Sequence, residues 1–251
     1  MEQPGPLASL RAHFRFPLRG DQVANRFLVG SGLLLAGLVI PFLPVLFVAG
    51  YGVQVMRRAT SGEAPRMYPW QDWGALLSDG FRSWVISLVF FVPGAAVMLG
   101  GYLFYFVSFV AMTGASGTDP EAGTVILFLL GMVSLFVGIG LGGLLFVVAS
   151  IFFPAALAHF AAEGRLVAAF HMRAWWRVMR SNPWGFAVAW LIVVGLFSLT
   201  YIASMTAYFT IVLICFLPIL LLPIYFYLML VGASLFGSAY AEGKAAQPTA
   251  G

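Results

Sequence analysis

"GLVIPFLPVLF", residues 37–47, interrupts the first long apolar run of the chain with two prolines, Pro41 and Pro44. Each proline lacks a backbone N–H donor and disfavours a helical conformation in the residue before it. The segment therefore predicts a tight reversal between two helical arms of about 22–40 and 45–59. A single kinked helix through both prolines is the alternative. The two interpretations place the segment after this run on opposite sides of the membrane.

The composition indicates that this chain lies in a lipid bilayer. Its 251 residues are 61% hydrophobic and 9% charged, with a mean hydropathy of +0.96, whereas soluble domains carry about 25% charged residues. Asp, Glu, Lys and Arg are absent from residues 27–56, 83–118, 122–162 and 181–241. Each of these runs exceeds the roughly 20 residues that a helix needs to cross about 30 Å of hydrocarbon. We therefore expect an all-α integral membrane protein whose first run is retained and not cleaved as a signal peptide.

Basic residues indicate which loops stay in the cytoplasm, because Lys and Arg are retained on that side of short loops. They occur before the first run, between the first and second runs, and between the third and fourth runs. In chain order these residues are Arg11, Arg15, Arg19, Arg26, Arg57, Arg58, Arg66, Arg82, Arg165, Arg173, Arg177 and Arg180, with Lys244 in the tail. The connections at 113–123 and 204–209 contain no basic residue, so we expect them to face outward.

This charge pattern predicts about six transmembrane helices arranged as three helical hairpins in the inner (cytoplasmic) membrane, with both termini in the cytoplasm. A cytoplasmic segment, 1–21, precedes a single membrane domain, 22–241, and a flexible tail, 242–251, follows it. Beyond the first two arms, the expected helices are about 84–112, 124–162, 184–205 and 209–239. The single cysteine, Cys215, lies in an apolar stretch, which excludes a disulfide framework within the chain.

The cytoplasmic ends of the three hairpins resemble one another. They read "TSGE" at 60–63, "AEGR" at 162–165 and "AEGK" at 241–244. Each places Gly before a charged residue, as expected where a helix ends in the left-handed conformation. In the first two copies a tryptophan follows the glycine by eleven residues, and another tryptophan opens the next run. A triplicated helical hairpin is one interpretation, and chance similarity of short segments is the other.

Two amphipathic segments, 66–82 and 164–180, are predicted to lie in the cytoplasmic interface of the membrane. In the second, three arginines share one helical face while tryptophan and methionine side chains share another. Such a helix buries its apolar side chains and places guanidinium groups among lipid phosphates. The residues expected at this interface are Trp70, Trp73, Trp84, Arg173, Trp175, Trp176, Arg177, Arg180 and Trp184. The expected partners are the lipid bilayer, including anionic phospholipid, and a membrane protein or a second copy of the chain, but not nucleic acid.

The stretch "GYGVQVMRRATSGEAPRMYPWQDWGALLSDGFRSWVISLVFFVPG", residues 50–94, resembles the signature of a family of bacterial and archaeal multi-pass membrane proteins known only as a domain of unknown function. The positions that carry the resemblance are Gly50, Tyr51, Arg57, Arg58, Gly62, Glu63, Pro69, Trp70, Asp72, Trp73, Asp79 and Gly80. The likeness covers about residues 14–243. One departure is Tyr68, which stands where a leucine would be expected before the proline. The resemblance implies no activity, ligand or catalytic residue.

Residues that could carry catalysis are sparse. None of the histidines, His13, His159 and His171, has metal-pair spacing to another ligand. His159 and Glu163 are four residues apart, which favours a helix-end contact over a functional pair. Asp72 and Asp79 are interpreted as helix caps or as partners of Arg66 and Arg82. No phosphate-binding loop or nucleophile elbow occurs, so we expect no enzyme, no cofactor and no metal site.

Transport is the main alternative. Ion-coupled carriers keep ionisable groups at mid-membrane depth, and the long runs contain none of the four charged types. An uncoupled pathway could still follow helices broken at Pro93, Pro154, Pro218 or Pro223. "GIGLGG", 138–143, allows close helix contact, which serves folding or oligomer formation. The leading hypothesis is therefore a non-enzymatic scaffold or accessory protein that binds membrane partners or lipid through its Trp/Arg face, and the alternative is a small uncoupled permease or lipid-handling transporter.

Overall fold

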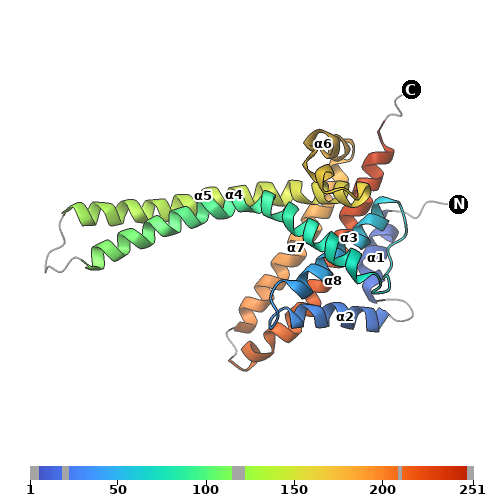
Figure 1. The fold of residues 1–251 in the computed structure, drawn as a ribbon, viewed down its shortest axis with the longest axis horizontal. Helices are drawn as coiled ribbons and strands as arrows, with labels where there is room; N and C mark the ends of the chain where they lie inside the picture. Colours follow the sequence, from blue (N-terminus) through green and yellow to red (C-terminus); the bar gives the residue numbers. More distant parts are fainter. Residues whose placement is uncertain (1–5, 19–22, 115–121, 209–210, 248–251) are drawn as a thin grey trace. The chain divides into compact units, whose positions relative to one another are not determined.

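The computed structural model describes residues 6–18, 23–114, 122–208 and 211–247, and every regular element in these ranges is a helix. Figure 1 shows the elements in chain order. Their bounds are α1 Pro6–Arg15, η1 Phe16–Leu18, α2 Val23–Ala36, α3 Leu43–Thr60, α4 Trp73–Gly114, α5 Ala122–Glu163, η2 Leu166–Phe170, α6 Met172–Ser181, α7 Pro183–Tyr208 and α8 Ile211–Ala245. The predicted all-α class is confirmed for these residues.

Four of these helices, α4, α5, α7 and α8, are long and apolar enough to cross a membrane. Their bounds agree with the predicted runs except that α4 begins at Trp73 and α8 ends at Ala245, so each includes one turn or more of polar sequence. The predicted outward connections include residues 115–121 and 209, among them Asp119 and Glu121, which lie outside the described residues.

The predicted break at the two prolines is confirmed. α2 ends at Ala36, α3 begins at Leu43, and the two helices contact each other. Phe42 adopts a positive φ of 70° immediately before α3, and Pro44 occupies the first turn of that helix, where a missing N–H donor costs nothing. α2 has 14 residues and α3 has 18, so they are about 21 and 27 Å long at 1.5 Å per residue. Both arms are shorter than the hydrocarbon thickness of about 30 Å.

The chain divides into two compact units, Ile86–Phe153 and the remainder, Met1–Val85 with Pro154–Gly251. The smaller unit consists of the apolar parts of α4 and α5, which pack side by side through small residues. A Cβ atom at Gly101 would meet the Ser134 carbonyl oxygen at 2.5 Å and the Gly138 Cα at 3.0 Å. The Ser134 hydroxyl also donates to the Gly101 carbonyl over 3.1 Å. The close contact predicted for "GIGLGG" is therefore made within one chain.

The larger unit is built around α8, which contacts α1, α2, α3, α6 and α7. Its buried residues include Phe226, Leu230 and Val231, each fully enclosed. α3 meets the first turns of α4 so closely that a Cβ atom at Gly50 or Gly80 would overlap a backbone carbonyl of the other helix. The packing of the N-terminal segment against α8 was not predicted, because residues 1–21 have too little periodic apolar sequence to indicate it.

The repeated Gly-charge turns have different outcomes. Gly62 and Gly164 have φ of +78° and +71°, as predicted for helix ends that need the left-handed conformation. The prediction for the third copy is wrong, because Gly243 lies inside α8 and packs against the Val178 carbonyl of α6. The predicted flexible tail, 242–251, consequently begins as helix and not as coil.

The helix contact in the smaller unit predicts opposite effects for two adjacent glycines. Gly101→Ala should separate α4 and α5 and lower the free energy of unfolding by about 1–3 kcal/mol, the usual cost of overpacking. Gly100→Ala is the matched control, because nothing lies within 4 Å of its added Cβ. Alanine there should be neutral or slightly stabilising, since Gly costs a helix interior about 0.5–1 kcal/mol. Thermal unfolding in detergent measures both variants, and equal destabilisation would contradict the proposed contact.

Candidate functional site

The segment between α3 and α4, residues 61–72, forms a strap that is bound tightly to the helices of the larger unit. The buried Tyr51 hydroxyl donates to the Tyr68 carbonyl over 2.9 Å and accepts from the Tyr68 amide at the same distance. Arg26 of α2 donates to the Met67 carbonyl over 2.6 Å. The Trp70 indole N–H donates to the Arg26 carbonyl over 2.8 Å. The bonds to Met67 and Tyr68 satisfy strap backbone groups that lie outside any helix, which explains how an irregular segment packs here.

Aromatic rings continue this attachment. Trp70 stacks on Tyr51 with 4.2 Å between ring centroids and approaches Phe226 of α8 at 6.3 Å. Trp73, at the start of α4, lies 5.8 Å from Trp70 and meets Phe47 edge-on at 5.2 Å. The Trp70 ring thus holds the strap against α3 and α8, and its position at the membrane interface stays a prediction.

A buried carboxylate joins three elements of the larger unit. Asp79 of α4 is 8% exposed and pairs with Arg57 of α3 at 2.8 Å and with Arg82 at 3.9 Å. Arg57 also donates to the Ala161 carbonyl over 3.0 Å, and Arg82 donates to the Gly164 carbonyl over 3.4 Å. Both carbonyls lie at the C-terminal end of α5, where cationic groups are stabilising. The predicted Asp79–Arg82 partnership is present, but Arg57 is the closer partner.

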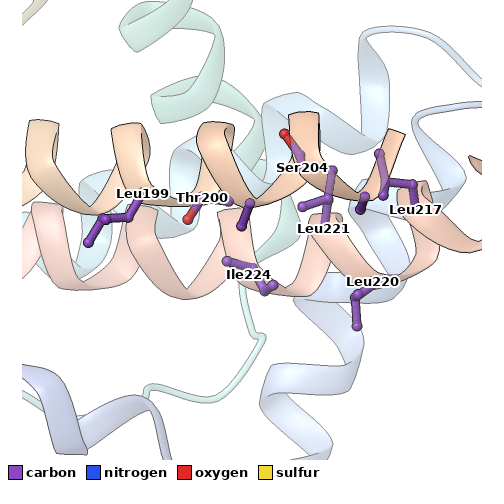
Figure 2. Close-up of a pocket in the computed structure, with 9 residues that line it drawn as sticks. Leu199, Thr200, Ser204, Leu217, Leu220, Leu221 and Ile224 are labelled. Atoms are coloured by element: carbon purple, nitrogen blue, oxygen red, sulfur yellow. The ribbon is translucent and has the colours of Figure 1, made fainter. Parts of the chain in front are cut away.

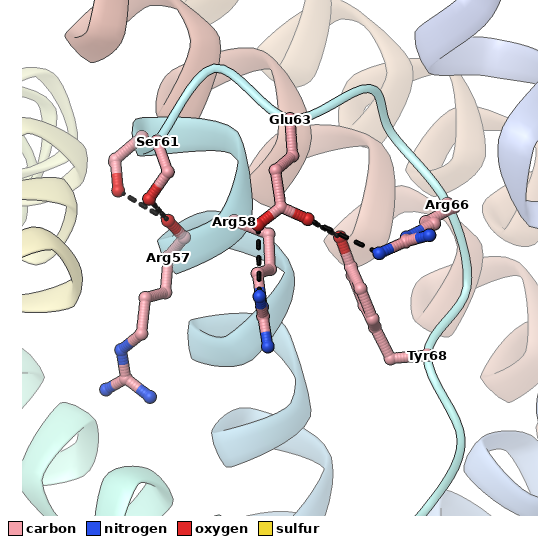
Figure 3. A network of polar contacts seen from close by, with 7 residues as sticks. Arg57, Arg58, Ser61, Glu63, Arg66 and Tyr68 are labelled. Carbon is pink, nitrogen blue, oxygen red and sulfur yellow. Dashed lines mark hydrogen bonds and ion pairs between the residues drawn. The ribbon is translucent and has the colours of Figure 1, made fainter.

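A second, exposed network lies on the strap and is shown in Figure 3. Glu63 accepts hydrogen bonds from Arg58 over 3.0 Å and from the Tyr68 hydroxyl over 3.4 Å, and pairs with Arg66 at 3.5 Å. Both guanidinium groups also lie over the Tyr68 ring, at 5.6 and 5.2 Å from its centroid. The hydrogen bond from Arg58 lowers the pKa of the Glu63 carboxyl below its ordinary value. The arginines on and beside the strap are thus compensated within the protein.

The α6 segment differs from the strap in how it uses its arginines. Arg173, Arg177 and Arg180 are exposed, and within the described ranges none of them forms an ion pair with a carboxylate. Arg180 lies over the Trp176 ring at 5.8 Å. We call the exposed residues of this helix the α6 surface. They are Met172, Arg173, Trp176, Arg177 and Arg180.

Two predictions about segment 164–180 need correction. It is not one helix, because η2 ends at Phe170 and α6 begins at Met172. Trp175 does not face lipid, because it is 2% exposed and its indole N–H donates to the Ala169 carbonyl over 3.0 Å. Together with the buried Val178 it attaches α6 to the protein. Helical periodicity groups Trp175 with Trp176, but only tertiary contacts show which of the two faces inward.

The remaining predicted interface residues are exposed to different degrees. Trp184 opens α7 and is 80% exposed, whereas Trp73 and Trp84 are 43% and 39% exposed. Trp84 lies near Phe81 and Phe42, with centroid separations of 6.0 and 6.5 Å. The structure does not gather all the predicted tryptophans into one cluster, since Trp70 and Trp175 are held by internal contacts.

An apolar groove lies between α7 and α8, with a volume of about 300 Å³. Figure 2 shows its walls, which are mainly aliphatic. The lining residues are Leu199, Thr200, Ala203, Ser204, Ala207, Leu217, Leu220, Leu221 and Ile224. The hydroxyls of Thr200 and Ser204 donate to carbonyls of their own helix over 2.9 and 2.7 Å. The groove is therefore suited to an apolar chain and offers no charged group to a polar solute.

Sequence reasoning missed two histidine contacts, one of them buried and the other half-buried. His13 hydrogen-bonds Ser234 at 2.6 Å across 221 residues, and His159 hydrogen-bonds the Tyr240 hydroxyl at 2.6 Å across 81 residues. The helix-end contact expected for His159 and Glu163 is thus not the main contact of this imidazole. Nothing in local spacing could have indicated either partner. Across the described ranges, no three His, Cys, Asp or Glu residues are placed to hold a metal ion.

The two carboxylates predict different mutational effects. Asp79→Asn should lower the free energy of unfolding by about 3 kcal/mol, because it leaves Arg57 half-buried and without its charge partner. Glu63→Gln is the control, and it should have little effect because exposed ion pairs contribute little. Chemical unfolding in detergent compares the two. If Glu63→Gln lowers the free energy of unfolding as much as Asp79→Asn does, the buried Arg57–Asp79 pair is not the stronger interaction.

Comparison with known proteins gives one match. The family described as "Protein of unknown function (DUF4013)" matches residues 33–208, which is more than half of the chain. No curated protein and no solved structure matches this chain. The matched range begins in the last turn of α2 and includes α3, the strap, α4, α5, α6 and α7. The predicted resemblance to a family of unknown function is therefore confirmed. On the strength of this match, the chain belongs to the DUF4013 family of proteins of unknown function.

Proposed function

We propose that this chain is a non-enzymatic, multi-pass protein of the cytoplasmic membrane that acts as a scaffold or accessory protein and binds anionic phospholipid through the α6 surface. The observation that carries the proposal is the contrast between two sets of arginines. Those at the strap are paired with Asp79 or Glu63, whereas those on α6 are exposed and have no carboxylate partner among the described residues.

Exposed apolar side chains beside these arginines support a membrane-surface location. Phe170, Met172 and Trp176 are 39%, 66% and 39% exposed, and Trp184 follows at 80%. A segment that exposes both guanidinium groups and aromatic rings suits the headgroup region, where phosphates and acyl chains are both within reach. α7, a helix able to span a membrane, begins at Pro183, two residues after α6 ends. The α6 surface therefore lies close in sequence to a point where the chain enters the bilayer.

The proposed topology has three helical hairpins, with both termini in the cytoplasm. The separation of α2 from α3 supports it, because a hairpin returns Arg57 and Arg58 to the side of Arg11 and Arg15. The short arms support a first hairpin that dips into the bilayer without reaching the other side in full. α4 with α5 and α7 with α8 supply the other two hairpins.

A lipid-handling or uncoupled permease role is the second candidate, and the groove between α7 and α8 favours it. The groove could accept an acyl chain, and it lies along α8 from Leu217 to Ile224, beside Pro218 and Pro223. It has no acidic or basic lining residue, which favours an apolar cargo over an ion. Transport of labelled lipid between leaflets of proteoliposomes would support this candidate, and its absence would favour the scaffold.

Topology is tested by cysteine labelling in a Cys215→Ser background. Single cysteines at Gly20, Ser61, Ser116 and Ala246 should respond differently to a membrane-impermeant maleimide added to intact cells. Only Ser116→Cys should react, because the other sites are proposed to lie in the cytoplasm. The same sites in inside-out vesicles provide the control. Reaction of Ser61→Cys from outside would show that the first apolar run crosses once, and would refute the hairpin.

The lipid surface is tested by native mass spectrometry of the detergent-purified protein with added phosphatidylglycerol or phosphatidylcholine. The triple variant Arg173→Gln, Arg177→Gln, Arg180→Gln should lose phosphatidylglycerol binding on the order of a hundredfold at low salt, at about 1 kcal/mol per arginine.

The matched control for this experiment is Arg58→Gln, Arg66→Gln, Arg82→Gln, which makes the same change in net charge. It should retain phosphatidylglycerol binding, because these arginines are already paired. An equal loss in both triple variants would indicate a general charge effect, and no loss in either would refute the site. Photo-crosslinking from position 176 that captures a protein partner in place of lipid would point to the scaffold role without lipid recognition.

A further inference from the structure

The N-terminal helix α1 is held on α8 by a small number of polar contacts in a buried setting. His13 is 8% exposed and its Nδ1 lies 2.6 Å from the Ser234 hydroxyl, which is fully buried. A second hydrogen bond comes from Tyr227 of α8, whose hydroxyl donates to the Phe14 carbonyl over 2.9 Å. Phe16 and Pro17 of η1 are also buried. These contacts dock α1 on α8, and α1 takes part in the first of the two hydrogen bonds through its His13 imidazole.

Among the described residues, none that contacts His13 carries a negative charge that would stabilise an imidazolium. Among the described elements, η1 and α8 pack most closely against α1. η1 consists of Phe16, Pro17 and Leu18 and has no ionisable side chain. The face of α8 at this site supplies a serine and a tyrosine hydroxyl, and within the described ranges no carboxylate forms an ion pair with His13. On α1 itself, the ionisable neighbours Arg11 and Arg15 are exposed and carry the same sign as an imidazolium.

We propose that α1 is a proton-controlled latch, which docks on α8 while His13 is neutral and is released when His13 takes up a proton. Release would free α1 with its exposed arginines and would uncover Ser234 and Tyr227 on α8. This device is separate from the α6 surface, and it holds whether or not that surface binds lipid.

The direction of the pH dependence follows from burial. Burial lowers the pKa of His13 below its ordinary value of 6.5, because the charged imidazole loses hydration. The docked state consequently binds fewer protons than the released helix. Docking is fully favoured above pH 6.5 and weakens as the pH falls from 6.5 through the lowered pKa. Within that window the docking equilibrium constant falls about tenfold for each pH unit.

The latch is tested by electron paramagnetic resonance distance measurement on the full-length protein in detergent. Spin labels are placed at Arg11→Cys on α1 and Ala246→Cys beyond α8, with Cys215→Ser, and spectra are recorded from pH 8 to pH 4.5. A narrow distance distribution should be present at pH 8 and should broaden reversibly below pH 6.5. An unchanged distribution over this range would overturn the proposal.

Two variants separate the latch from general acid unfolding. His13→Gln keeps a neutral hydrogen-bonding side chain, so its distribution should stay narrow at every pH. Ser234→Ala removes one partner and should shift the onset of release to higher pH, while the dependence on acid persists. A second label pair within the larger unit, at Arg58→Cys and Glu242→Cys, reports whether the fold survives. Broadening in His13→Gln equal to that of the parent protein would refute the role of the imidazole.

Discussion

The lack of water in hydrocarbon is the constraint on which this structure depends. Each backbone N–H and C=O group there needs a partner within the protein, so the apolar runs must be helical and irregular backbone must be bound by other groups. Irregular backbone that is buried against protein has the same need, and the strap meets it through hydrogen bonds made by Tyr51, Arg26 and Trp70. The turn at Phe42 illustrates a different solution, because it lies between Pro41, which follows the end of α2, and Pro44, which occupies the first turn of α3.

Charge is distributed by the same rule. Asp79 is tolerated in a buried position because Arg57 and Arg82 compensate it and share their remaining donors with the end of α5. These arginines therefore stabilise the junction of three helices and are not free for a ligand. The arginines of α6 make no such contact with carboxylates among the described residues, and they remain able to bind an external anion. This division separates the arginines that are compensated within the protein from those that we propose to bind lipid.

The family gives the chain a place among related proteins, but it assigns no activity. Function must therefore be argued from the site, and two sites point to different roles. The α6 surface favours contact with the membrane surface, while the groove between α7 and α8 favours an apolar ligand. The histidine that binds α1 to α8 belongs to neither site.

Sequence alone determined the solvent of this protein, its long helices, the break at Pro41 and Pro44, and the left-handed ends at Gly62 and Gly164. These features depend on hydropathy and backbone preference, which are local sums over neighbouring residues. Only the tertiary structure decided that Trp175 faces inward beside an exposed Trp176, that Gly243 lies inside a helix, and that His13 meets Ser234. Each of these outcomes depends on which distant side chain fills the adjacent space, and packing of that kind leaves no periodic trace in the sequence.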